Sequence, residues 1–306
     1  MRFGVWGRRM HLHRTHPLLL AGLLLGGVIV VALAGCERAA LPPLRGGATK
    51  PAQAVALLTR HLHDNDLVAF ARDAVPPDLH KRLQTGWVQG RTRWPLTEMP
   101  FHERLPRLLL SLSAEGSEAR LQAVFDRQFS GATTELKAAA ASLGLFGAQY
   151  IRNEGDFSDD ERRHYAQFVQ AISRWGVSAP LGDAQRARRA IPQLAVAARQ
   201  TGLRSEADFQ EAGMTESLRR LGPFVATVKQ VLAGYGLALD ESLGGLEAGL
   251  VDQDDDHARV RLRYTLGSTR IDTVVSVERH GNRWYLSDYL RHAEASLQGP
   301  AVAPLQ

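Results

Sequence analysis

The segment HLHDND, from His61 to Asp66, gathers side chains that commonly bind metal ions. Two histidines that share a zinc ion on a helix lie best four residues apart, because that spacing places them on one face. His61 and His63 are two residues apart and point about 200° away from each other on a helix. On a turn the two imidazoles could converge. We favour a polar helix end, at which Asn65 or Asp66 caps the next helix.

Two other segments approach known metal sites without completing them. The stretch FHERLPR begins like the zinc motif H-E-x-x-H, but Pro106 stands where the second histidine belongs. An acidic run contains Asp252, Asp254, Asp255 and Asp256. An EF-hand calcium loop needs glycine and glutamate where this chain has His257 and Arg263, so we favour a solvated turn over a calcium site of another kind. The single cysteine, Cys36, excludes a multi-cysteine metal site, and we predict neither metal nor cofactor.

The sequence also lacks the usual signatures of nucleophilic and nucleotide chemistry. It contains no G-x-S-x-G, no Ser-x-x-Lys, no phosphate-binding Walker loop and no dinucleotide fingerprint. We therefore name no catalytic residue and lean against an enzyme. A hydrolase whose residues meet only in the fold stays an alternative, and the histidines to inspect are His80, His102, His164, His257, His280 and His292.

Two groups of side chains could contact a partner or ligand. The first is Trp87, Arg91, Arg93 and Trp94 in the loop-like stretch TGWVQGRTRWPLTEMPF. Tryptophan and arginine are enriched at interface hot spots, although a loop tryptophan also serves to anchor its loop to the core.

The second group is Arg259, Arg261 and Arg263, which alternate along the polar face of a predicted strand. They could bind an anionic lipid headgroup or a cell-wall carboxylate. The predicted pairing places Arg263 opposite Asp272, with Glu278 on the same face, so a solvated face with cross-strand ion pairs is the simpler interpretation.

The net charge of +5 is concentrated at the N-terminus. The first 35 residues carry four arginines and no acid, so without them the net charge is +1. A nearly neutral body gives no electrostatic reason to bind nucleic acid, and we predict none as a partner.

The first 36 residues follow the pattern of a secretory signal. Residues 1–17 hold four arginines and three histidines, and residues 18–35 form an uncharged, mostly apolar run. An uncleaved transmembrane anchor fits the length of this run. The sequence Leu33-Ala34-Gly35-Cys36, however, resembles the lipobox of bacterial lipoproteins. That resemblance implies cleavage between Gly35 and Cys36 and acylation of the Cys36 thiol, which would make the lipid bilayer a partner.

The residues after the cysteine bear on location and reach. In enteric members of the lipoprotein family, aspartate at the next position retains the protein in the inner membrane. This chain has Glu37, so the resemblance favours the periplasmic face of the outer membrane. Residues 36–50 contain Pro-Pro and Gly-Gly without an apolar period, which predicts a flexible tether.

The remaining chain predicts an α+β fold: a helical region over 51–245 and an antiparallel β-meander of three to four strands over 246–306, covered by helices. Helical apolar spacing marks residues 51–63, 66–74, 105–112, 121–129, 133–146, 158–175, 183–200 and 215–235. Ser158 and Glu161 form a capping box, Gly176 suits a left-handed helix end, and Pro192 predicts a kink or two pieces.

Alternation with period two predicts the strands. A turn at Gly267-Ser268 would pair Tyr264 with Ile271 and would place Leu262, Val260 and their partners on one buried face. A helix must cover that face, and 215–235 is the natural candidate. The closing stretch GNRWYLSD is weakly similar to the last strands of the nuclear-transport-factor-like fold.

We therefore expect an envelope lipoprotein that binds or scaffolds an envelope protein or cell-wall component without catalysis. One alternative is a carrier that holds a small apolar ligand between the meander and its helices. The other is a periplasmic hydrolase without a recognisable motif.

Overall fold

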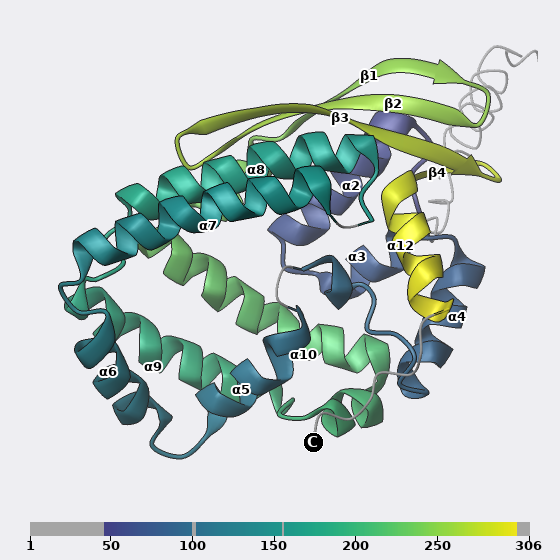
Figure 1. The fold of residues 1–306 in the computed structure, drawn as a ribbon. Coiled ribbons are helices and arrows are strands. Elements are labelled where there is room, and N and C mark those ends of the chain that lie inside the picture. The colour runs from purple at the N-terminus through teal and green to yellow at the C-terminus, as the bar shows by residue number, and fades with distance from the viewer. Residues whose placement is uncertain (1–45, 100–101, 155, 299–306) are drawn as a thin grey trace, which may run out of the picture. The chain divides into compact units, whose positions relative to one another are not determined.

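The computed structural model describes residues 46–99, 102–154 and 156–298. The chain divides into two units, residues 1–44 and residues 45–306, and every described residue belongs to the second. The buried members of all three hydrophobic clusters lie in this second unit, so it has the core of a unit that folds on its own. Its helices and single sheet confirm the predicted α+β class (Figure 1).

The described helices follow one another along the chain before and after the sheet. They are α2 (Pro51–His63), α3 (Leu67–Asp73), α4 (Pro77–Val88), the 3-10 helices η1 (Leu96–Glu98) and η2 (His102–Arg104), α5 (Leu105–Ser113), α6 (Ser117–Gln128), α7 (Thr133–Asn153), α8 (Asp159–Ser178), α9 (Ala184–Thr201), α10 (Glu206–Gly234), α11 (Leu239–Gly244) and α12 (Ser287–Gln298). None of these described helices is long and apolar enough to cross a bilayer.

The sheet is an antiparallel meander in the order β1 (Glu247–Asp254), β2 (His257–Leu266), β3 (Thr269–His280) and β4 (Arg283–Leu286). Its register confirms the predicted pairing, with Tyr264 opposite Ile271. Gly267 takes a φ of +58° at the turn between β2 and β3. Buried and exposed residues alternate along β2 and β3, so one face is apolar and faces the helices.

The inner face of the sheet packs mainly against α2 and α8, which lie beneath it in Figure 1. The sequence points to the helix over 215–235 as the cover, and this is wrong. That segment belongs to α10, whose side chains face Leu262 and Val275 of the sheet across a cavity. Its apolar stripe contributes Leu221 and Phe224 to the main core.

The pair α7 and α8 shows how small residues bring two helices close. The capping box at the start of α8 is present as predicted, with the side chains of Ser158 and Glu161 each bonded to the other's backbone N–H. Gly176 does not end the helix, because α8 continues to Ser178. A Cβ on Gly176 would lie 3.0 Å from the Cβ of Ala140 in α7, so glycine serves close packing there.

Two long helices contain residues that can disrupt a helix, but only one of them is interrupted. Pro192 lies inside α9, which nevertheless runs continuously from Ala184 to Thr201 instead of breaking into two pieces. In α10 the break lies at Gly213, whose φ of 71° is not helical. A proline removes one hydrogen bond but keeps a helical φ, whereas a positive φ interrupts the helix geometry itself.

The first described residues are fixed to the body by backbone bonds. The Gly46 N–H donates to Oδ1 of Asp73 at 3.1 Å, and the Gly47 N–H donates to the Asp73 carbonyl at 3.0 Å. Ala48 forms an antiparallel bridge with Trp284 of β4. Residues 46–48, which belong to the predicted tether of residues 36–50, are therefore bonded to α3 and β4.

Candidate functional site

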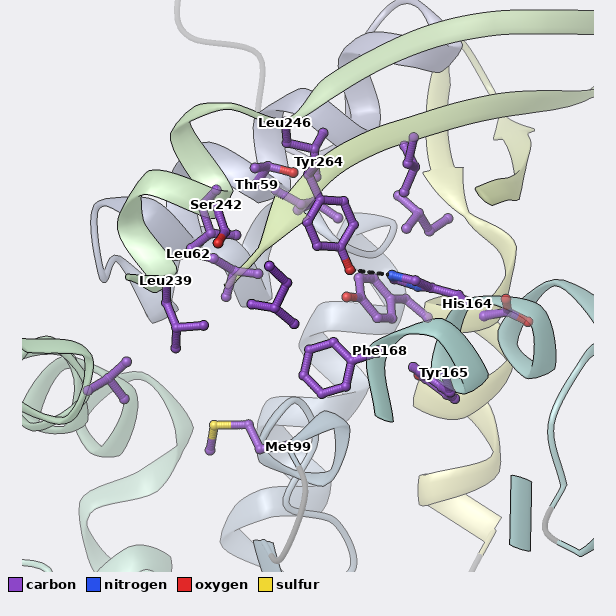
Figure 2. A pocket seen from close by; sticks show the side chains of 18 of the residues that line it. Thr59, Leu62, Met99, His164, Tyr165, Phe168, Leu239, Ser242, Leu246 and Tyr264 are labelled. Atoms are coloured by element: carbon purple, nitrogen blue, oxygen red, sulfur yellow. Dashed lines mark hydrogen bonds between the residues drawn. The ribbon is translucent and has the colours of Figure 1, made fainter. Parts of the chain in front are cut away.

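A cavity of about 780 Å³ lies between the inner face of the sheet and helices α2, α8, α10 and α11. This volume falls in the range of small-molecule sites, whereas ordinary protein interiors leave few voids larger than a water molecule. In Figure 2, Phe168 from α8, Tyr264 from β2 and Leu62 from α2 surround the same space. The aliphatic and Phe lining residues are Val55, Leu58, Leu62, Met99, Leu105, Leu108, Phe168, Leu221, Phe224, Val225, Val228, Leu239, Leu243, Leu246, Leu262, Leu266, Val275 and Leu286.

The alternation of β2 and β3 supplies one wall of this cavity. Leu262, Tyr264 and Leu266 project from β2 at every second residue, and Val275 projects from β3. The opposite wall comes from α10, in which Leu221, Phe224, Val225 and Val228 recur at helical spacing. Two amphipathic elements thus turn apolar faces toward each other without closing the space between them.

An uncharged hydrogen-bonded pair lies inside the apolar lining. Nε2 of His164 lies 2.7 Å from the hydroxyl oxygen of Tyr264. The dashed line in Figure 2 marks this hydrogen bond. Burial lowers the pKa of His164 below its ordinary value and raises the pKa of Tyr264. Both side chains are therefore neutral at neutral pH, and burial in an apolar cavity costs a neutral pair less than it would cost a charged one.

Acidic residues line the cavity where α8 and α12 begin. Asp160 accepts a hydrogen bond of 2.6 Å from the Ser276 hydroxyl and pairs with Arg163. Asp288 accepts one of 3.1 Å from the Ser158 hydroxyl. Burial and the neighbouring charge of Glu161 raise the pKa of Asp288.

A buried ionic network joins α12, α8 and η1 behind this acidic lining. Nδ1 of His292 lies 2.9 Å from Glu98 Oε2, and Nε2 lies 3.1 Å from Glu161 Oε1. Hydrogen bonds to Glu161 and Glu98 raise the pKa of His292 to about 10, so the imidazole is charged at neutral pH. Arg291 also pairs with Glu161. The network holds α12 in place beside the cavity.

Lys229 of α10 is a buried cation that also lines the cavity. Its ammonium group donates to the carbonyl oxygens of Leu62 and His63, each at 2.9 Å, and pairs with Asp240. An ammonium group has three donors, and these contacts use all three. Lys229 therefore fixes α10 to the end of α2 and has no donor left for an anion.

The arrangement does not form a serine-histidine-acid triad among the described residues. Of the histidines inspected, His102 and His164 line the cavity, but His102 lies 3.3 Å from the Met99 carbonyl oxygen and His164 bonds to Tyr264. The cavity serine Ser276 donates directly to Asp160. A nucleophile needs a base within hydrogen-bond reach, and the structure pairs no serine with a histidine here.

The Trp-Arg group of the sequence lies away from the cavity. Trp87 and Trp94 are fully buried, which agrees with anchoring to the core and leaves no tryptophan surface for a partner. Trp87 Nε1 donates to the Phe209 carbonyl at 2.8 Å. Arg93 is buried and pairs with Glu206 at 3.0 Å, whereas Arg91 is exposed.

The three strand arginines lie on the polar face of β2, as predicted. Arg261 pairs with Asp272 at 2.6 Å, and Arg263 lies 3.5 Å from the same carboxylate. Arg259 lies 3.5 Å from Asp252. Each arginine thus has an acidic neighbour, which is the cross-strand pairing favoured above.

The metal-capable side chains of the HLHDND segment do not converge on one point in the structure. His61 bonds to Asp73 at 2.9 Å, and His63 bonds to Asp64 at 2.8 Å. Asp66 caps α3 by accepting from the Ala69 N–H. Across the described ranges, no three metal-capable side chains gather around one point.

Sequence reasoning missed the contribution of α12 to the site. Asp288, Tyr289 and His292 lie in a segment that the sequence treats as the end of the meander and a tail. The stretch SDYLRHAEASLQ does carry a helical signal, because Leu290 and Ala293 are three residues apart and are both buried.

Comparisons with known protein families, with curated proteins and with solved structures find no match. The lipobox residues Gly35 and Cys36 lie outside the described residues, so lipidation stays a prediction. The proposed role therefore rests on the cavity and on the sequence pattern.

Proposed function

We propose that this chain is a non-catalytic envelope lipoprotein whose body binds a small apolar ligand between its sheet and its helices. The observation that carries the proposal is the cavity of about 780 Å³ with its mostly apolar lining. Of the roles that the sequence leaves open, the carrier is the one that requires such a cavity.

The energetics favour an apolar occupant. Each methylene group moved from water into an apolar site gains about 0.8 kcal/mol. The lining offers few polar groups that still need a partner, since Lys229, Asp160 and Glu161 already have theirs. A hydrocarbon chain therefore suits this site better than a sugar or a nucleotide.

The proposed location comes from the first 36 residues. Acylation at Cys36, with cleavage after Gly35, would hold the body at a bilayer, and Glu37 favours the periplasmic face of the outer membrane. Two or three acyl chains anchor a protein firmly, whereas one chain binds only marginally. This is tested by growing cells that express the wild-type protein or Cys36→Ser with a palmitate analogue. Label on the wild-type protein alone supports the lipid anchor. Equal label on both proteins, or label on neither, refutes it.

The cavity is tested with the uncharged dye N-phenylnaphthylamine and purified residues 45–306, whose folding is first checked by circular dichroism. We expect saturable fluorescence enhancement at one dye per protein. Val225 lines the cavity, so Val225→Phe fills part of it and should weaken dye binding at least about tenfold. The control Val196→Phe changes an exposed valine on α9 and should leave binding unchanged. Absence of saturable binding, or equal binding by both variants, would refute the proposal.

A further inference from the structure

The first residues of α12 bring an acid and a phenol to the cavity. Asp288 and Tyr289 are neighbours in sequence, and both line it. Burial raises the pKa of Tyr289 most, and the charges of Glu98, Glu161 and Asp288 raise it further. The Tyr289 ring lies edge-on to Phe70 with centroids 5.6 Å apart, so its position is fixed by the core.

Both side chains have hydrogen-bonding capacity to spare. Oδ2 of Asp288 accepts from Ser158, but the only bond to Oδ1 among the described residues is a long one of 3.5 Å from Arg291. The Tyr289 hydroxyl has no hydrogen-bond partner within the described part of the chain. The cavity lining therefore includes one acceptor, on Asp288, and one donor, on Tyr289, that the described residues leave available to a ligand.

The charge balance around these two groups disfavours an anion. Asp160, Glu161 and Asp288 all line the cavity. The nearby cations are already paired: Arg163 with Asp160, Arg291 with Glu161, and the charged His292 between Glu98 and Glu161. A ligand carboxylate placed beside Asp288 would lose its hydration and meet a like charge.

Arg104 is a cation that lines the cavity and is not part of these ion pairs. Arg104 has no ion pair within the described ranges, and its side chain is exposed to solvent. Water screens an exposed guanidinium, so its pull on an anion is weaker than that of a buried cation. A fatty acid held by Arg104 is the competing arrangement that an experiment must separate.

We propose that the ligand is a single-chain lipid with an uncharged polar group, such as a glycerol ester or an alcohol, and that this group bonds to Asp288 and Tyr289. A ligand hydroxyl donates to Asp288 and accepts from Tyr289, while the chain lies along the apolar lining. This inference rests on the proposed function, because it specifies which apolar ligand the cavity holds.

The test uses the full chain in isolated membranes and three photoreactive probes that share one diazirine-bearing decyl chain. The first probe ends in a glycerol ester, the second in a carboxylate, and the third is a plain hydrocarbon. Cross-linked cavity peptides are quantified by mass spectrometry relative to the total label in the membrane. We expect the glycerol ester to label the cavity about tenfold more than the carboxylate.

Two variants connect this preference to the named residues. Asp288→Asn removes the repelling charge and should bring carboxylate labelling to within about twofold of the ester. Tyr289→Phe keeps the ring and should lower ester labelling several-fold while hydrocarbon labelling, which reports an intact cavity, stays unchanged. The control Tyr150→Phe changes an exposed tyrosine of α7 and should alter neither.

The outcomes separate the two proposals. Equal or stronger labelling by the carboxylate, or variants with wild-type preferences, overturns the headgroup assignment, while hydrocarbon labelling in the cavity keeps the proposed function. No cavity labelling by any probe overturns both.

Discussion

The ionic network around His292 predicts a specific loss of stability as the pH rises. His292 is only 24% exposed and lies within 3.1 Å of two carboxylates. Hydrogen bonds to Glu161 and Glu98 raise its pKa to about 10, from 6.5 for an unperturbed histidine. A raised pKa means that the folded protein holds the proton more tightly than the unfolded chain does.

The size of the effect follows from these two pKa values. The contribution is fully present below pH 6.5 and is lost as the pH rises to about 10. Within this window each pH unit removes about 1.4 kcal/mol of the free energy of unfolding, or about 5 kcal/mol in total. His292→Gln lacks the charge at every pH, so Glu98 loses its cationic partner and Glu161 keeps only Arg291. It should be destabilised by a few kcal/mol at the acidic end of the window.

The measurement is urea unfolding of residues 45–306 at several pH values across this window. The wild type should lose stability toward the alkaline end, and the gap between it and His292→Gln should shrink there. His280→Gln, which changes an exposed histidine paired with Glu278, serves as the control and should keep the wild-type pH slope. Parallel pH dependence of the wild type and His292→Gln would refute the assigned role of His292.

Two further predictions concern local structure. Gly47 has a φ of +61°, and a Cβ there would lie 2.8 Å from the Tyr285 ring, so Gly47→Ala should lower the free energy of unfolding by about 1–3 kcal/mol and reduce Tm. A Gly47→Ala variant with unchanged Tm would contradict this close contact. Ser158→Ala removes the cap of α8 and the bond to Asp288, and should cost about 1 kcal/mol in urea unfolding. A loss no larger than that of a substitution at an exposed helix position would show that the cap contributes nothing.

The meander could be predicted in detail because its signal is local. Alternation over β2 and β3, together with a glycine turn, fixes the register, and the predicted pairs of Tyr264 with Ile271 and Val260 with Val275 are present. The capping box at Ser158 is equally local, since it depends on two residues three positions apart. Short-range patterns of this kind need no knowledge of the remaining fold.

Other features depend on tertiary contacts that the sequence does not display. Gly176 matches a helix end in sequence, but it lies inside α8, where the missing side chain leaves room for Ala140 of α7. The helix α4 escaped notice because its residues Thr85 to Trp87 precede a Gly-rich and Pro-rich stretch. The sequence points to the long helix over 215–235 as the cover of the sheet, whereas packing gives that role to α2 and α8.

The cavity itself was foreseen only as an alternative. In the sequence its lining residues have the pattern of ordinary core residues, because Phe168 and Leu221 each belong to an apolar stripe with helical spacing. Whether two apolar faces touch or stand apart depends on the distance between their elements, which residue types do not determine. The polar group at Tyr289 was missed for a different reason: α12 follows β4 directly, without a loop that would mark a new element.

If Cys36 is lipidated as proposed, the attachment of Gly46 to Asp73 limits the length of chain between the lipid and the body. Ten residue steps separate positions 36 and 46, and at most about 3.3–3.6 Å per step gives a maximum of roughly 35 Å. The attachment point of an anchored body would thus stay within this distance of its own bilayer. Cargo could pass between that bilayer and the cavity over a short path, whereas delivery to a distant membrane would require a second carrier.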